Sequence, residues 1–419
     1  MVCRLGIQMK PLLRAIASIL ILQAAGSLAQ QPSPSESSFM NPDISTLAQE
    51  NNAFAVDLYA KLSTHPGNLF FSPASVSTAF AMAYAGARGT TAIQMASTLH
   101  FALPPDRLHP AMGALLTQLN GSHQDYELHM ANALWAAKDQ HFLTDYTSLM
   151  KTDYAAGFQP VDFQSNPEAA RALINKWVAD QTQQKILNLV PASSVTPLTR
   201  LILTNAIYFK GSWETPFVKT ATANEDFHLA SGQSVTVPLM HLTDDISYFN
   251  GGSFQAVSLP YQSAKLSMIV LLPNDPATLP ALEQSLTAPQ FSQWLTQAHS
   301  SEKVVLTLPK FTMTQQFDLG STLAALGMAD AFSPSAADFS AITGHRDLFI
   351  SAAIHKAFID VNEEGTEAAA ATAITMRATA MRYEPPPIIF RADHPFLFLI
   401  RDNSTGAILF LGRLTDPTQ

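Results

Sequence analysis

Side chains able to do acid–base, nucleophilic or metal chemistry are scattered along this 419-residue chain rather than gathered in a motif. No G-x-S-x-G, HExxH, phosphate-loop or dinucleotide-binding pattern occurs, and no serine sits on a motif that would expose it at a sharp turn. Five histidines of the front half have spacings that match no metal-binding signature: His100, His109, His123, His129 and His141. The sequence therefore predicts no enzyme active site, no metal site and no cofactor.

One stretch, residues 363–387 (EEGTEAAAATAITMRATAMRYEPPP), has a composition that bears on function. Glu363, Glu364 and Gly365 open it, small uncharged residues follow as far as Arg377, and three prolines close it. Such a segment has no groups for catalysis. Any role that it has must come from its conformation.

Alternate positions of this stretch differ in charge. The face that begins at Thr366 carries no charge, whereas the face that begins at Glu367 also holds Arg377. This is the alternation of a strand with one buried face, yet alanine is the best helix former and a poor strand former. Two interpretations stay open: a strand that lies outside the sheet in another state, or a flexible Ala/Thr-rich linker.

Composition and charge exclude several classes of protein. The chain is 47 % hydrophobic and only 14 % charged, so it is expected to fold, and its length allows one to three domains. A net charge of -9 argues against nucleic acid and anionic membrane surfaces as partners.

The first 29 residues have the features of a secretory signal peptide. Arg4, Lys10 and Arg14 make a positive start, residues 15–22 form a short apolar run, and residues 27–29 (SLA) offer a small-residue cleavage site. The sequence therefore predicts a secreted protein, extracellular or periplasmic, without a thiol, because the single cysteine lies in the removed part. An N-terminal membrane anchor is the alternative, although the apolar run is short for a bilayer.

The elements that position these residues are helical in the front half and strand-like in the back half. Residues 30–45, rich in Gln, Pro and Ser at their start, are expected to be a disordered lead-in. Residues 201–209 (LILTNAIYF) read as a central strand, apolar on both faces, with Asn205 inside it. No linker divides the halves, so residues 46–416 are predicted to form a single α+β domain.

Six motifs along nearly the whole chain then identify a family. The sequence resembles the serpins at residues 68–75 (NLFFSPAS), 204–213 (TNAIYFKGSW), 308–311 (LPKF), 355–371 (HKAFIDVNEEGTEAAAA), 390–396 (FRADHPF) and 408–413 (ILFLGR). The order and spacing of these motifs together are highly specific.

The resemblance implies the serpin fold, with three β-sheets, about nine helices and an exposed reactive-centre loop at about residues 363–387. It also implies suicide inhibition of a serine protease, or of a cysteine protease, by a monomer. The protease attacks the loop and forms an acyl-enzyme, and the freed loop inserts into the main sheet as a strand and distorts the trapped protease.

Site residues carry over by motif. The resemblance implies a shutter, a polar cluster under the centre of the sheet, at Ser72, Ser75, Asn205 and His355. The alternative interpretation of these four is that they are ordinary hydrogen-bonded core residues. The breach, where the loop enters, is implied at Trp213, Lys310 and Glu363. The hinge is implied at Glu363, Glu364, Gly365, Thr366, Glu367, Ala368, Ala369, Ala370 and Ala371.

The reactive bond is implied at Thr379–Ala380 by the family's usual loop length. Such a bond suits a protease with a small primary pocket, elastase-like or subtilisin-like. Arg377, Met381 and Arg382 mark alternative bonds, and cleavage at Arg382 would make the target trypsin-like.

Two other functions compete with inhibition. A non-inhibitory serpin would act as a carrier, storage or folding-helper protein, and such members tend to have charged, bulky or proline residues in the hinge, which this chain lacks beyond Glu367. A secreted adhesion or structural protein would not need the alternation in the hinge at all.

Overall fold

The computed structural model describes residues 41–155, 157–297, 300–366 and 386–419, which belong to one compact unit, Met40–Gln419. Several predicted features lie outside these residues. They are the signal peptide at 1–29, most of the lead-in, the hinge from Glu367 to Ala371, and the bond between Thr379 and Ala380.

The predicted lead-in ends earlier than expected. Helix α1 (Pro42–Leu62) begins at a residue assigned to the disordered 30–45 segment, so residues 42–45 are helical. Asn41 caps the helix by accepting a hydrogen bond from the backbone N–H of Asp43, and Pro42 occupies the first turn, where its missing N–H costs nothing. Asparagine followed by proline is thus a helix start.

Ten α-helical segments occur in the described residues, two of them only four residues long, in agreement with the expected nine or so. After α1 they are α2 (Pro73–Gly86), α3 (Gly89–Thr98), α4 (Pro105–Leu119), α5 (Thr144–Asp153), α6 (Pro167–Gln181), α7 (Leu279–Gln284), α8 (Ala288–Gln297), α9 (Gly320–Leu323) and α10 (Ser340–Thr343).

Strands dominate the second half, as the sequence indicated. The strands are β1 (Leu69–Phe71), β2 (Gly121–Ser122), β3 (Tyr126–Ala137), β4 (Phe158–Val161), β5 (Leu201–Ser212), β6 (Ala223–His228), β7 (Ser234–Asn250), β8 (Phe254–Pro260), β9 (Leu266–Pro273), β10 (Ser300–Pro309), β11 (Phe311–Asp318), β12 (Ile350–Asn362), β13 (Gly365–Thr366), β14 (Ile388–Arg391), β15 (Phe396–Asp402) and β16 (Ile408–Leu414).

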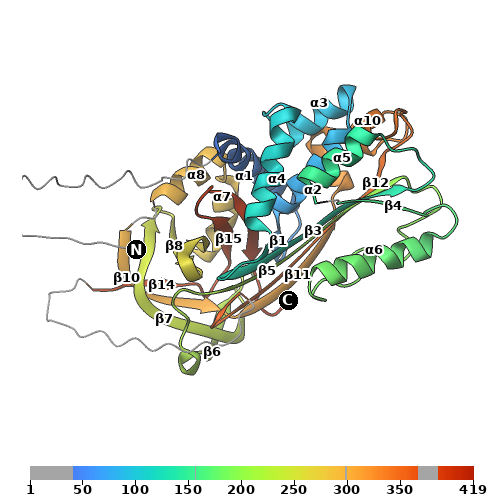
Figure 1. Ribbon diagram of the computed structural model, residues 1–419. Helices are drawn as coiled ribbons and strands as arrows, with labels where there is room; N and C mark the ends of the chain where they lie inside the picture. Colours follow the sequence, from blue (N-terminus) through green and yellow to red (C-terminus); the bar gives the residue numbers. More distant parts are fainter. Residues whose placement is uncertain (1–40, 156, 298–299, 367–385) are drawn as a thin grey trace, which may run out of the picture. The chain divides into compact units, whose positions relative to one another are not determined.

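The main sheet has the order β11-β12-β13-β5-β3-β2, with β4 on β3. Strand β5 lies in its interior between β3 and β12, as the doubly apolar 201–209 segment predicted. Figure 1 shows α6 on one face of this sheet and α2, α4 and α5 on the other. Buried residues agree, because Ile174 and Val178 of α6 pack against Trp135 and Ile202 of the sheet.

The remaining strands form one hydrogen-bonded network that β7 divides into two parts. The first half of β7 pairs with β6 and its middle with β10, which carries β14 at the edge. Its last residues pair with β8, which continues through β9, β15 and β16 to β1. With the main sheet, these two parts make the three sheets that were expected.

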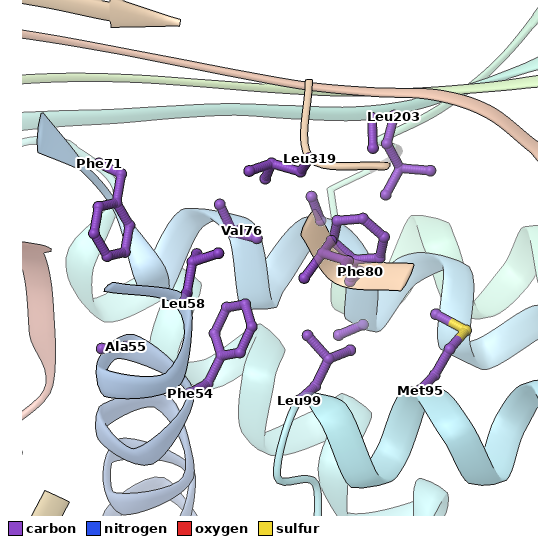
Figure 2. Packing of buried hydrophobic residues seen from close by; sticks show 14 of the residues in the cluster. Phe54, Ala55, Leu58, Phe71, Val76, Phe80, Met95, Leu99, Leu203 and Leu319 are labelled. Atoms are coloured by element: carbon purple, nitrogen blue, oxygen red, sulfur yellow. The ribbon is translucent and has the colours of Figure 1, made fainter. Parts of the chain in front are cut away.

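The largest core cluster fills the space between the main sheet and the front helices. Figure 2 shows Val76 and Phe80 of α2 between Phe54 and Leu58 of α1 and Leu203 of β5. Helix α2 is apolar on nearly all sides and therefore fully embedded. Its N-terminus consequently meets the underside of the main sheet, where the polar residues of the next section lie.

Candidate functional site

The predicted hinge begins a strand inside the main sheet. Gly365 and Thr366 form β13, which pairs antiparallel with β12 on one side and antiparallel with β5 on the other. Farther along, β5 and β12 pair directly with each other in parallel, from Ile350 to Phe358. Gly365 and Thr366 are thus wedged between the ends of two strands that are otherwise neighbours.

Gly365 is required at this point. Its φ is +154°, and a Cβ atom added there would lie 2.1 Å from the carbonyl oxygen of Gly211 on β5. Real side chains never approach a backbone atom so closely, so any other residue would push β13 away from β5.

Thr366 is the first residue of the uncharged face, and it is fully buried. Its hydroxyl forms a 2.7 Å hydrogen bond with the hydroxyl of Tyr261, which is itself buried and stacked on Trp213 at a centroid distance of 4.6 Å. Burial raises the pKa of Tyr261 far above its usual value, so its hydroxyl stays protonated. The side chain of Thr366 therefore points into the core.

The base of the hinge is held by the breach residue Trp213 and the segment after it. The backbone N–H of Trp213 donates to the carbonyl of Glu364 at 2.9 Å, and its indole Nε1 donates to the carbonyl of Asn362 at 3.0 Å. Phe217 N–H donates to the carbonyl of Glu363 at 2.8 Å. These bonds fix where the chain leaves β12.

Two ion pairs surround the same place. Lys310 Nζ lies 3.1 Å from Glu363 Oε2, and Lys219 pairs with Glu364. Burial alone would raise the pKa of Glu363, but its hydrogen bonds, including the one from Lys310, lower the pKa overall and keep the carboxylate ionised. Because both lysines are largely exposed, each pair contributes about 1 kcal/mol at most.

The predicted shutter residues meet beneath the centre of the main sheet. Ser72 is the N-cap of α2, and its hydroxyl accepts the backbone N–H of Ser75 at 3.1 Å. The Ser75 hydroxyl accepts in turn from the amide of Asn205 on β5 at 2.6 Å. The N-terminus of α2 is thereby fixed to the sheet.

His355 on β12 connects this cluster to the neighbouring strand. The backbone N–H of Ser72 donates to His355 Nε2 at 3.1 Å, so this nitrogen is an acceptor and the proton is on Nδ1, which faces the Asn205 side-chain oxygen. His355 and Asn205 are also paired across β12 and β5. Their contact spans the seam that a new strand would have to open.

The electrostatics of His355 follow from its burial. Burial lowers the pKa of His355 to about 3, because a charged imidazolium would have no water around it. A proton on Nε2 would also point at the N–H of Ser72. The hydrogen bonds that His355 forms with Ser72 and Asn205 therefore require the neutral imidazole.

Sequence reasoning missed two residues of the site. Asn132 on β3 is one: its side-chain oxygen accepts from Ser75 and Asn205, and its amide donates to the Ser75 carbonyl at 3.1 Å. An isolated asparagine in an apolar strand was an available signal. Tyr261 is the other, and its contact with Thr366, 105 positions away, has no sequence signal.

Two further features are absent from the described residues, a metal-binding cluster and a membrane-spanning helix. Among them, no group of three or more His, Cys, Asp or Glu side chains is placed to hold a metal ion. No helix in the described part of the chain is long and apolar enough to cross a membrane.

Comparison with known proteins places this geometry in context. A family model described as "Serpin (serine protease inhibitor)" matches residues 49–417. Leukocyte elastase inhibitor from Homo sapiens is 41 % identical over 381 residues, covering 88 % of this chain and 99 % of that protein. Serpin B6 from Macaca fascicularis is 40 % identical, with the same coverage. The structure of uncleaved ovalbumin matches with a TM-score of 0.80 at 31 % identity, covering 88 % of this chain and all of that one.

These relatives contradict the predicted localisation. The sequence indicated a secreted protein, but leukocyte elastase inhibitor and serpin B6 are intracellular. The positive start and short apolar run on which the prediction rested lie before residue 49, outside the family match. The prediction of secretion is therefore wrong.

Proposed function

Because the chain belongs to the serpin family, we propose that it is a suicide inhibitor of serine proteases, whose loop is cut and then inserts into the main sheet. The observation that carries this proposal is β13. Two hinge residues, Gly365 and Thr366, already pair antiparallel with both β5 and β12. They lie at the end of the seam along which β5 and β12 pair with each other in parallel. An inserting strand would extend β13 along that seam.

The register of β13 predicts how the inserted strand would lie. Continued in the same pairing, Ala368 would lie between Phe209 of β5 and Ile359 of β12, both buried in the core. Thr372 would lie between Asn205 and His355, where it would separate the two shutter residues. The small residues of the uncharged face suit both places, and about fifteen residues would form a strand on the order of 50 Å long.

We further propose Thr379–Ala380 as the reactive bond and an elastase-like or subtilisin-like enzyme as the target. A small residue before the bond suits a small primary pocket, and a similar protein carries the name leukocyte elastase inhibitor. Arg377, Met381 and Arg382 remain the alternative positions. A cysteine protease is the alternative target class. We also propose that the inhibitor is a monomer.

A gel-shift experiment tests the proposal. The protein is mixed with elastase, subtilisin or trypsin and run under denaturing conditions, and the same proteases with a blocked catalytic serine serve as controls. We expect a covalent complex with elastase or subtilisin, none with the blocked enzymes, and a released C-terminal fragment that begins at Ala380. A fragment that begins elsewhere would move the reactive bond. Clean cleavage without any complex would refute inhibition and favour a non-inhibitory serpin.

A further inference from the structure

A cavity of about 480 Å³ lies beside the breach, and the proposed inhibitory mechanism assigns it no role. It is formed where β7 passes from one part of its sheet to the other, at Leu242 to Ser247, opposite the ends of β8 and β15. Its volume falls in the range of about 300 to 1,000 Å³ that is typical of small-molecule sites.

One side of the cavity carries a pre-oriented cation. Arg401, near the end of β15, donates from Nε to the side-chain oxygen of Asn403 at 3.0 Å. The Asn403 amide is itself fixed, because it donates to the carbonyl of Ala264 at 2.8 Å and to the hydroxyl of Ser267 at 2.7 Å. The guanidinium fork is thus held in one orientation, and its two terminal nitrogens have no partner among the described residues.

Asp402 stabilises the charge of Arg401 through space, but within the described residues it forms no hydrogen bond with the two terminal nitrogens. The buried Asp402 carboxylate accepts from the Ser404 hydroxyl at 2.7 Å and from the N–H and hydroxyl of Thr405 at 2.9 and 2.6 Å, so the turn after β15 occupies it. Burial lowers the pKa of Arg401. Arginine nevertheless remains charged, so a desolvated cation with two free donors faces the cavity.

The cavity also contains an anion. Asp244 lies on the same face of β7 as the buried residues Leu242 and Ile246, and it forms no ion pair within the described part of the chain. Its carboxylate accepts one hydrogen bond, from the N–H of Asp245 at 2.9 Å. Glu214 adds a further negative charge at the exposed rim.

We propose that this cavity binds a small amphipathic zwitterion, such as a short apolar peptide with free ends. The ligand's carboxylate would pair with Arg401 in the bidentate manner that guanidinium groups favour, and its ammonium group would pair with Asp244. Its apolar body would contact Phe217 and Leu259. A simple anion fits less well, because the acidic residues of the lining outnumber the single arginine.

The proposed site is connected to the hinge but does not depend on inhibition. Trp213 and Phe217 line the cavity, and their backbone N–H groups hold Glu364 and Glu363 at the base of the hinge. An occupant would therefore contact the segment that anchors the loop. Binding is measured on the intact protein without a protease, so the outcome does not depend on whether the protein inhibits one.

Calorimetric titration with the dipeptide phenylalanyl-leucine tests the proposal, alongside two derivatives, the N-acetyl form without the ammonium group and the C-terminal amide without the carboxylate. We expect the dipeptide to bind and each derivative to bind at least about tenfold more weakly. Arg401→Met and Asp244→Asn should each weaken dipeptide binding by a similar factor. Arg346→Met, at an exposed arginine elsewhere, should leave it unchanged.

Thermal unfolding first establishes that each variant is folded. If Arg401→Met does not fold, Asp244→Asn alone is sufficient to test the proposal. Equal binding of the dipeptide and both derivatives would overturn the proposal. Wild-type affinity in the folded variants would do the same. Absence of dipeptide binding at concentrations on the order of 10 mM would also overturn it.

Discussion

A single buried histidine links the two strands that would have to separate. His355 on β12 is kept neutral by burial, accepts a hydrogen bond from the backbone N–H of Ser72 and faces Asn205 on β5. A buried polar network of this kind is stable when complete and costly when partly broken. These contacts therefore stabilise the pairing of β12 with β5, and under the proposed mechanism they would also oppose its opening.

Acid should destabilise the protein through His355. Its pKa is about 3 in the folded state, against 6.5 for an unperturbed histidine. Below pH 6.5 the unfolded state binds the extra proton and the folded state does not, so the stability that this histidine provides above pH 6.5 is lost as the pH falls toward 3. Between pH 7 and pH 5 the loss is about 2 kcal/mol. Denaturant unfolding at both pH values measures it.

The variant His355→Asn isolates this contribution. From pH 7 to pH 5 the free energy of unfolding of the wild type should fall, and that of the variant should fall by about 2 kcal/mol less. This difference does not depend on how stable the variant is at pH 7. His109 acts in the same direction, since burial lowers its pKa to about 4, but it is present in both proteins. The control His65→Asn removes an exposed histidine without touching the network. An unchanged pH dependence in His355→Asn would contradict the assignment.

At the scale of elements, β13 predicts which face of the loop would be buried on insertion. The hydroxyl contact between Thr366 and Tyr261 directs the side chain of Thr366, the first residue of the uncharged face, toward the core. Adjacent residues of a strand point to opposite faces, so the next two positions should differ sharply in what they tolerate. If the proposed insertion continued this register, Ala368 would come to lie between Phe209 and Ile359.

The same continued register would bring Glu367 between Lys210 and Asp360, which are partly exposed. Ala368→Arg should therefore convert the protein from an inhibitor to a substrate, because insertion would bury an unpaired charge at a cost of several kcal/mol. We expect the fraction of protease trapped as covalent complex to fall at least about tenfold.

Glu367→Arg is the matched control for Ala368→Arg, since it introduces the same side chain one position earlier, on the opposite face. It should retain nearly all complex formation. Densitometry of the denaturing gels measures both variants. Equal loss in the two would show that bulk or charge in the hinge matters regardless of face, and would refute the face assignment.

The sequence predicted the face but not the position of the strand. Alternation of charge around Thr366 and Glu367 indicated one buried side, because that pattern is local. The start of β13 depends on the space between β5 and β12 and on Tyr261, which are distant in sequence. Alanine-rich propensity could not indicate it either, since alanine favours helices. Asn132 was missed because it lies in none of the family motifs and meets Ser75 and Asn205 only in the folded chain. Ser72, Asn205 and His355 were found through motifs.

At the scale of the whole molecule, the uncut chain is not in its most stable arrangement if the proposed mechanism holds. The seam between β5 and β12 is parallel, and only two residues of a further strand occupy it. Cleavage would free the loop to fill the seam with antiparallel pairing on both sides. The intact loop tethers β13 to β14, which pairs with β10 in a different sheet.

Cleavage of the loop should therefore stabilise the protein against heat. If about ten of the roughly fifteen residues of the inserted strand each add a backbone hydrogen bond worth on the order of 1 kcal/mol, the unfolding temperature should rise by roughly 10 °C or more. Scanning calorimetry of intact and loop-cleaved protein measures the change. Ala368→Arg, cleaved in the same way, is the control, because a charge on the inserting face should remove most of the gain. A cleaved wild type that unfolds at the temperature of the intact protein would show that the seam does not accept the loop, and the inhibitory mechanism would then have no source of free energy.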